Sequence, residues 1–418
     1  MSFTVPPAAR SWIAVDADSH FPIQNLPFGM KGDGTLVTRV GDTLVSLPAL
    51  AAEGLLPGQP GRYASLESLA RSGGSAALSE VRRALYELIE ASSPRLRDDA
   101  ALREAACSPA DDLHMALPMR PGAFLDFYSG IHHASNVGRM FRPEQPPLLP
   151  NYRHLPVGYN GRASSVVPSG VPVRRPKGQT KAPDADGPAF GPSRELDFEL
   201  EMGFYLAEGC ELGESIAVAD AERHMAGMVI VNDWSARDVQ RWEYQPLGPF
   251  LSKSFLTSVS PWLVTLDALE PFRVAGMAQE PEPLPHLRRG GDQIFDIRLE
   301  VRLQSARMTA PVTICTSNTK HLYWSMAQQL AHQTSNGTNV QVGDLYASGT
   351  ISGEDEGTFG SLLELTWRGQ SPIRLEETFE EREFLEDGDV VTMTAYALGD
   401  GFRVGFGEVT ALVLPAKE

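Results

Sequence analysis

Hydrophobic and polar residues alternate over several short stretches of this chain, most clearly between residues 196 and 202. There the apolar Leu196, Phe198, Leu200 and Met202 alternate with the acidic Asp197, Glu199 and Glu201. A period of two predicts a β-strand with apolar side chains on one face and three carboxylates on the other. Carboxylates two residues apart on a strand lie about 7 Å from each other, because each residue advances about 3.4 Å. Their repulsion must be offset, so the pattern leaves open a solvated edge face or a hard-cation site.

The first part of the chain combines a hairpin pattern with helical patterns. Two apolar-rich runs, Thr35–Val40 and Thr43–Leu47, are joined at a Gly-Asp pair and predict a β-hairpin. Apolar residues at helical spacing predict a helix over Ser75–Ile89. Asp98 or Asp99 is expected to cap a short helix that ends at Ala106. We therefore expect a small β-rich N-terminal domain over residues 1–118.

Glycine and proline separate many short strand-like runs in the remaining residues, 119–418. These runs are Met228–Val231, Trp262–Leu266, Phe295–Leu303, Val390–Tyr396, Val404–Phe406 and Val409–Leu414. Regular turn signals between short strands favour a sandwich or barrel. One helix is predicted from Leu322 to Ala331, with a stop at Asn336-Gly337. Pro176–Pro192 and Glu280–Gly291 are rich in proline and charge and predict exposed loops, so the fold class is mainly β, of α+β type.

Composition and charge narrow the classes of function. The 418 residues are 42% hydrophobic and carry a formal net charge of −17, which disfavours phosphate backbones and anionic lipid as partners. The three cysteines are scattered without a CxxC motif, which is typical of a reducing compartment and argues against a thiolate zinc site. No stretch is apolar enough for a membrane span or a secretion signal, so we expect a cytoplasmic protein.

Polar residues of several chemical types gather in one segment, Asp126–Arg142. It contains Tyr128, the adjacent His132 and His133, Asn136 and two arginines. A single histidine is more often structural than catalytic. A histidine that lies near a carboxylate, a tyrosine and an arginine is a stronger candidate for a general base.

Three further segments supply charged residues in apolar surroundings. Asp233 follows a buried-looking run, and Arg237, Gln240 and Tyr244 would share one face if their segment is helical, although a solvated amphipathic helix stays possible. Lys253 stands in an uncharged loop and needs water or an anion. Glu364 interrupts an apolar run, so its burial would demand a partner. This inventory suits metal-assisted hydrolysis or lyase chemistry on an oxygen-rich anionic substrate.

Long stretches of the chain resemble the fumarylacetoacetate hydrolase family. The most specific stretches are His154–Ser165, Asn232–Asp238, Pro246–Phe250 and Leu345–Gly353, and the resemblance runs from Phe21 to Gly407. It implies a small SH3-like N-terminal β-barrel domain followed by a larger mixed β-sandwich roll. It also implies a homodimer and a bound divalent cation, Ca²⁺ or Mg²⁺.

The resemblance also implies roles for individual residues. His133 is expected to be the general base, paired with Glu364. The expected metal ligands are Asp126, Glu199, Glu201 and Asp233, with a second Mg²⁺ near Asp233, Lys253 and Thr257. The expected oxyanion-stabilising residues are Arg237, Gln240 and Lys253. The expected substrate contacts are Tyr128, Arg142, Tyr159, Gln240, Tyr244 and Thr350. His132 has no assigned role and is expected to be structural or solvated, and Asp197 has no ligand role and is expected to be structural.

The reaction implied by the resemblance is hydrolysis of a carbon–carbon bond in a small β-diketo acid, 4-fumarylacetoacetate, to fumarate and acetoacetate. This is the last step of tyrosine and phenylalanine breakdown. Acylpyruvate hydrolases, oxaloacetate decarboxylases and sugar-acid dehydratases share the superfamily fold but are generally shorter, so the N-terminal extension favours the first activity. A cation-binding protein without turnover would leave His133, Glu364 and Lys253 without a purpose.

Overall fold

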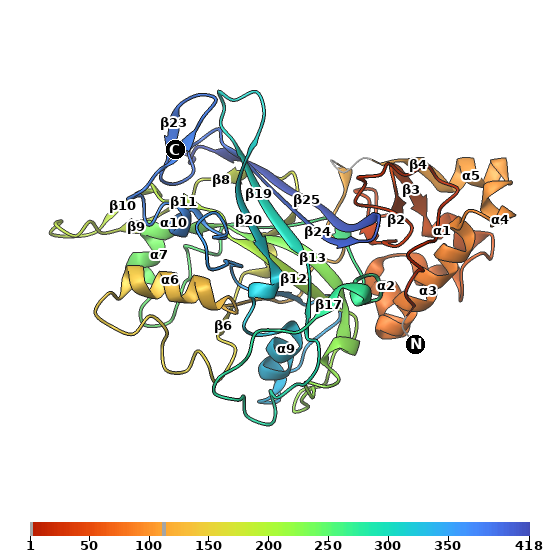
Figure 1. Cartoon of the computed structure of the whole chain (residues 1–418), viewed down its shortest axis with the longest axis horizontal. Helices are drawn as coiled ribbons and strands as arrows, with labels where there is room; N and C mark the ends of the chain where they lie inside the picture. Colours follow the sequence, from red (N-terminus) through yellow and green to blue (C-terminus); the bar gives the residue numbers. More distant parts are fainter. Residues whose placement is uncertain (1–2, 111–113) are drawn as a thin grey trace.

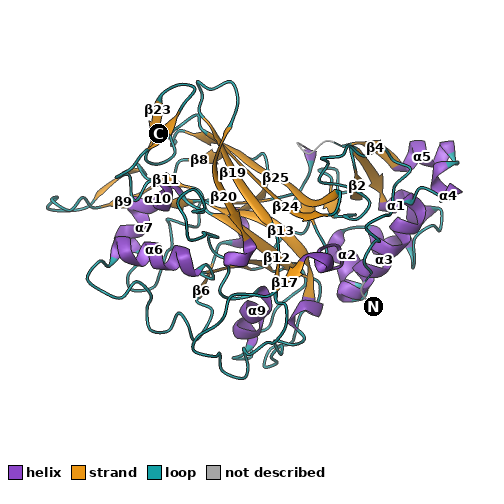
Figure 2. Cartoon of the chain, in the orientation of Figure 1, coloured by secondary structure: helices purple, strands orange, loops and turns teal. Residues whose placement is uncertain are grey.

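The computed structural model describes residues 3–110 and 114–418 as a sheet-rich mixed α/β protein. Figure 1 shows the N-terminal part, red to orange, at one end of the molecule and the remaining sheets at the other. The strands occupy the centre, and most helices and loops lie around them (Figure 2). None of the helices within these residues is long and apolar enough to cross a membrane.

A five-stranded antiparallel sheet organises the N-terminal part. Its order is β16 (Trp262–Leu263), β1 (Phe28–Met30), β2 (Leu36–Val40), β3 (Thr43–Ser46) and β4 (Cys107–Pro109). The edge strand β16 therefore comes from the distant C-terminal part and pairs with β1 through Phe28 and Leu263. The hairpin β2–β3 confirms the predicted one, and its turn residue Gly41 has a φ of +54°, which glycine adopts without steric cost.

Several α-helices and a 3₁₀ turn of the described residues lie beside this sheet. They are α1 (Leu47–Ala52), η1 (Pro60–Tyr63), α2 (Leu66–Arg71), α3 (Gly74–Ile89), α4 (Pro94–Arg97) and α5 (Ala100–Ala106). The helices predicted over 75–89 and up to Ala106 are confirmed, and Asp99 caps α5 by accepting the Leu102 N–H at 3.0 Å. Apolar residues of α3 share one buried cluster with Val229 and Val231 of β13, so α3 packs against the main sheet.

The main sheet has seven strands and supports the candidate site. Its order is β6 (Gly158–Asn160), β5 (Phe124–Phe127), β21 (Leu345–Ala347), β12 (Leu200–Leu206), β13 (Met225–Asp233), β15 (Thr257–Val259) and β7 (Val166–Pro168). The pairs β21–β5 and β15–β7 are parallel, and the others are antiparallel. Strand β13 is buried along its whole length, as expected for an apolar run covered on both faces.

A second large sheet packs against the main one. Its order is β20 (Val312–Asn318), β19 (Arg298–Gln304), β24 (Val390–Gly399), β25 (Phe402–Leu414) and β8 (Val173–Arg174). Alternate residues of β24 are buried, and β24 and β25 contact β13. The runs that we expected as separate strands near 404–406 and 409–414 form the single strand β25, because the hairpin with β24 continues through a bulge near Thr394.

Smaller elements cover the edges of the two sheets. The helices are α6 (Ile131–Phe141), α7 (Arg237–Glu243), α8 (Leu266–Leu269), α9 (Met326–Thr334) and α10 (Leu362–Leu365). The 3₁₀ turns are η3 (Ala163–Ser165), η4 (Ala221–His224), η5 (Glu270–Phe272) and η6 (Thr319–His321). Two-stranded pairs are β9 (Lys177–Thr180) with β10 (Ala189–Pro192), β11 (Leu196–Asp197) with β14 (Ser235–Ala236), β17 (Arg273–Val274) with β18 (Ile294–Phe295), and β22 (Ile373–Leu375) with β23 (Glu380–Arg382).

Two of these elements correct expectations from the sequence. The segment 176–192 is not simply a loop, because β9 and β10 pair as a projecting hairpin (Figure 1). Helix α9 begins at Met326 and not at Leu322, because Ser325 forms a capping box with Gln328 that sets the first turn. The helix ends at Thr334, shortly before the expected Asn-Gly stop.

The alternating segment 196–202 also differs from its prediction. It is not one strand but two, β11 and β12, which belong to different sheets. Between them, the Glu199 N–H donates to the side chain of Asn232 on β13 and not to a backbone carbonyl. All seven side chains are buried, so the solvated edge face is wrong.

Candidate active site

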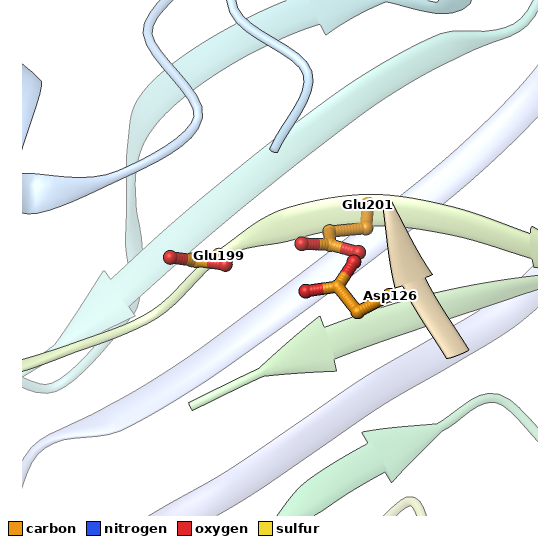
Figure 3. A group of neighbouring side chains, drawn as sticks. All are labelled: Asp126, Glu199 and Glu201. Carbon is orange, nitrogen blue, oxygen red and sulfur yellow. The ribbon is translucent and has the colours of Figure 1, made fainter. Parts of the chain in front are cut away.

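Three carboxylates from two neighbouring regions of the main sheet converge in the interior. Asp126 lies on β5, Glu201 on β12, and Glu199 in the break before β12. One oxygen from each lies within 4.8 Å of the others. Figure 3 shows the carboxylates of Asp126 and Glu201 facing each other, with Glu199 to one side.

This arrangement fits a divalent cation. Asp126 Oδ1 and Glu201 Oε1 are buried and accept no hydrogen bond from the described residues. Burial, followed by the neighbouring carboxylates, raises the pKa of Asp126 and of Glu201 well above the ordinary carboxyl value. A cation would replace the missing donors and offset the repulsion, and an all-oxygen donor set suits Ca²⁺ or Mg²⁺.

Asp233, at the end of β13, is connected to this group through Lys253. Its Oδ2 accepts from Lys253 Nζ at 2.8 Å and from the Tyr159 hydroxyl at 2.7 Å, while Oδ1 accepts from Thr257 Oγ1 at 2.6 Å. Lys253 also donates to Glu199 and lies 3.7 Å from Asp126 Oδ2. The anion that the isolated lysine required is therefore supplied by distant carboxylates. Burial opposes its charge, but the carboxylates, Asp233 first, raise the pKa of Lys253.

His133 and Glu364 form a buried pair beside the acidic group. His133 lies in the first turn of α6, and its Nδ1 is 2.6 Å from Oε2 of Glu364 on α10. An ionised Glu364 accepts the Nδ1–H, which leaves Nε2 of His133 able to accept a proton. Burial alone would raise the pKa of Glu364, but His133 and the other hydrogen-bond donors lower it below its ordinary value.

Three residues without a role in the sequence analysis complete the surroundings of Glu364. Asn136 donates to Oε1 at 3.0 Å, and the hydroxyls of Ser352 and Ser361 donate to Oε2 at 2.9 Å each. Asn136 follows His133 by three residues, so both project from one face of α6. That spacing could have identified Asn136 from the sequence, and so could the three-residue spacing from Ser361 to Glu364, whereas Ser352 reaches Glu364 from 12 positions away.

Arg237 is held at the start of α7 by several acceptors. Its Nη1 lies 2.6 Å from Glu199 Oε1 and 3.2 Å from Gln240 Oε1, while its Nε donates to Asp197 at 2.8 Å. Its Nη2 is buried and has no partner among the described residues. Burial opposes the charge, but Glu199 and Asp197 raise the pKa of Arg237, so it stays cationic. The predicted helical face over 237–244 thus carries Arg237 and Gln240 into the site.

These groups surround a cavity of about 520 Å³. Its wall includes all residues expected to contact substrate, namely Tyr128, Arg142, Tyr159, Gln240, Tyr244 and Thr350, together with His133, Arg237 and Lys253. Asp126 and Glu199 reach the cavity, whereas Glu201, Asp233, Thr257 and Glu364 lie behind its surface. His132 points elsewhere, with its ring 5.8 Å from that of His321.

Comparisons with known proteins identify the family of this chain. Residues 123–413 match the family model for the fumarylacetoacetate (FAA) hydrolase C-terminal region, and residues 24–118 match the one for the fumarylacetoacetase N-terminal region. The chain is 48% identical over 415 residues to fumarylacetoacetase of Bos taurus, covering 97% of this chain and 99% of the relative. It is also 48% identical over 420 residues to that of Homo sapiens, with the same shares.

A solved structure extends the likeness of fold. The fumarylacetoacetate hydrolase of the psychrophilic Exiguobacterium antarcticum has a TM-score of 0.54 to this chain at 17% identity, covering 94% of this chain and all of that one. At this identity the match shows the fold alone. On the sequence matches over nearly its whole length, this chain belongs to the fumarylacetoacetate hydrolase family.

Proposed function

We propose that this chain hydrolyses the carbon–carbon bond of 4-fumarylacetoacetate to fumarate and acetoacetate, the last step of tyrosine and phenylalanine catabolism. The observation that carries the proposal is the His133–Glu364 pair, which opens into the same cavity as the carboxylates of Asp126 and Glu199. The 48% identity to relatives named fumarylacetoacetase, which extends over 97% of this chain, supports this substrate.

His133 is the general base. With Nδ1 bound to Glu364, its Nε2 takes the proton of the attacking water, and the carboxylate of Glu364 stabilises the imidazolium that forms. The Asn136 and serine hydrogen bonds keep Glu364 ionised and fixed in position.

Cationic and amide donors stabilise the negative oxygen that forms when water adds to the carbonyl. Arg237, Gln240 and Lys253 line one side of the cavity for this purpose. Arg142, together with the hydroxyls of Tyr128, Tyr159, Tyr244 and Thr350, binds the polar groups of the substrate. Removal of one oxyanion donor typically lowers the rate by about 100- to 1000-fold.

Asp126, Glu199, Glu201 and Asp233 hold the divalent cation, Ca²⁺ or Mg²⁺. When bound there, the cation supplies Lewis acidity for the two oxygens of the diketone and for the enolate that leaves. A second Mg²⁺ near Asp233, Lys253 and Thr257 is also part of this proposal, and in either role Asp233 would exchange hydrogen bonds from protein side chains for the cation.

The proposal also includes the domain organisation, the location and the assembly that we expected from the sequence. Residues 1–118 form an SH3-like β-barrel domain, and residues 119–418 form the catalytic β-sandwich roll. The active form is a cytoplasmic homodimer.

A metal-reconstituted assay tests the proposal. The chain is treated with a chelator and then supplied with Ca²⁺, Mg²⁺ or Mn²⁺, while the loss of fumarylacetoacetate absorbance is followed. We expect turnover that requires a cation and that exceeds turnover of acylpyruvates and oxaloacetate. Faster turnover of either alternative substrate, or no turnover of fumarylacetoacetate with any cation, would reject the assignment.

A further inference from the structure

Asp197 is a fully buried carboxylate outside the group of metal-capable acids. Its Oδ2 accepts from Arg237 Nε at 2.8 Å and from the Leu363 N–H at 3.1 Å. Its Oδ1 accepts from the Leu362 N–H at 2.7 Å. One carboxylate therefore binds both the guanidinium of Arg237 and the first turn of α10, the helix that carries Glu364.

Helix α10 depends on Asp197 for its N-terminal hydrogen bonds. The residue before the helix, Ser361, makes no side-chain cap, because its hydroxyl donates to Glu364. The first N–H groups of a helix need acceptors from elsewhere, and here Asp197 provides them. The carboxylate thus stands at the start of the turn from which Glu364 reaches His133.

Arg237 has two carboxylate partners, but they are not equivalent. Glu199 also accepts from Lys253 and belongs to the group that would hold a cation. Asp197 has Arg237 as its cationic partner and is free of those other contacts. Asp197 binds Nε of Arg237, and Glu199 and Gln240 bind Nη1. Because the guanidinium is planar, these contacts also set the direction in which Nη2 points.

We propose that Asp197 is a positioning residue for the hydrolysis: it holds the Arg237 guanidinium at a set place relative to the Glu364–His133 pair. The inference rests on the proposed function. Asp197 touches neither the cavity nor the reacting atoms, and it acts through the orientation of Arg237.

The variant Asp197→Asn tests the orientation. An asparagine amide can turn its N–H₂ toward the Arg237 Nε–H, donor against donor, or toward the Leu362 N–H, which leaves Arg237 with a neutral oxygen in place of a carboxylate. Both orientations weaken the hold on the guanidinium, because a hydrogen bond to a charged acceptor is the stronger one. Loosening one oxyanion donor should cost less than the about 100- to 1000-fold expected for its removal. We expect kcat to fall about 10- to 100-fold, while KM changes less than about threefold, because the loss concerns the transition state.

Asp238→Asn is the matched control. Asp238 is also buried, adjoins Arg237 in α7, and accepts from the Ser193 hydroxyl at 2.6 Å and the Arg194 N–H at 2.8 Å. These hydrogen bonds reach neither Arg237 nor α10, so their loss should lower thermal stability and leave kcat within about twofold.

A double-mutant cycle separates positioning from a general structural role. In an Arg237→Gln background, Asp197→Asn should lower kcat by less than about threefold, because the group it orients is already gone. An equal loss in both backgrounds, or no loss in the wild-type background, overturns the proposal. If Asp197→Asn does not fold, Asp197→Ser keeps an acceptor for α10, removes the contact with Arg237, and enters the same cycle.

Crystal structures of the variant give a readout that does not need turnover. We expect a displaced Arg237 guanidinium in Asp197→Asn, with the 2.6 Å contact between His133 and Glu364 retained. An unmoved guanidinium overturns the inference about Asp197, whether or not the chain is active. Inactivity on fumarylacetoacetate, by itself, rejects only the proposed function.

Discussion

Replacement of Glu364 by glutamine removes the negative charge from the His133–Glu364 pair and keeps a side chain of nearly the same shape. In the wild type, Oε2 faces three groups, His133 Nδ1 at 2.6 Å and two serine hydroxyls, and Oε1 accepts from Asn136. A glutamine amide must point its N–H₂ either at His133 and the serines or at Asn136. With the N–H₂ toward Asn136, two donors face each other. With the N–H₂ toward His133, Nδ1 must accept, so the proton moves to Nε2 and the ring can no longer take a proton from water there.

The size of the effect follows from these contacts. The imidazolium that forms during water activation loses its carboxylate partner, and general acid–base assistance is worth about 100- to 10,000-fold. We expect kcat to fall into that range. We also expect the free energy of unfolding to fall by about 1–3 kcal/mol, the cost of a buried polar group left without a partner.

The pH dependence of stability adds an independent check. Because folding lowers the pKa of Glu364, its contribution to stability is present above the pKa of the unfolded chain and is lost as pH falls through the lower folded value. The wild type should therefore lose this contribution below about pH 4.3, the ordinary glutamate value, while Glu364→Gln should not. Urea unfolding at several pH values measures the difference.

Asp344→Asn is the control for the loss of a buried charge. Asp344 accepts backbone N–H groups of Ala123 and Gln341, away from the cavity lining, and should affect stability without affecting kcat. If Glu364→Gln retained more than about a third of the wild-type kcat, the pairing with His133 would have no catalytic role.

Four further changes test the remaining parts of the site. His133→Ala should abolish hydrolysis of fumarylacetoacetate while circular dichroism shows an intact fold, and a wild-type rate would refute its role as base. Glu199→Ala or Glu201→Ala should weaken Ca²⁺ binding in calorimetry clearly more than Asp197→Ala, and equal effects would contradict the division between ligands and positioning residue. Lys253→Met should destabilise the metal-free chain by about 3–5 kcal/mol in urea unfolding, because it leaves Asp233 without its buried cation and Glu199 with Arg237 alone, and an unchanged unfolding free energy would refute this. Chelation should lower the Tm of the wild type and added Ca²⁺ should restore it, because a cation offsets the repulsion between Asp126 and Glu201; a Tm insensitive to both would count against a metal at this place.

Local patterns predicted many elements well because their causes are local. The helix α3 follows from its apolar spacing, α5 from its Asp99 cap, and the β2–β3 hairpin from its Gly-Asp turn. The pattern at 196–202 misled for the opposite reason. Its alternation is a property of seven residues, but the break at Glu199 is set by Asn232 and by Arg237, which the tertiary fold brings there.

The same distinction applies to the candidate site. The candidate residues came from the motifs and from the resemblance, and the fold gathers them around one cavity. Sequence reasoning treated Asp197 as structural because alternation says nothing about which carboxylate meets which partner. The cap that Asp197 gives to α10 joins residues 165 positions apart along the chain, and Ser352 lies 12 positions from Glu364, so no local pattern encodes these contacts.

The edge strand β16 has a consequence for how this chain folds during synthesis. The sheet of the N-terminal part needs Trp262 and Leu263, which leave the ribosome long after β1 has been made. Until then, β1 presents an unpaired edge with a free row of backbone donors and acceptors, and such edges invite pairing with other chains. A nascent chain halted before residue 262, or a fragment cut to residues 1–118, is thus a species exposed to aggregation, which the completed chain prevents by closing its own sheet.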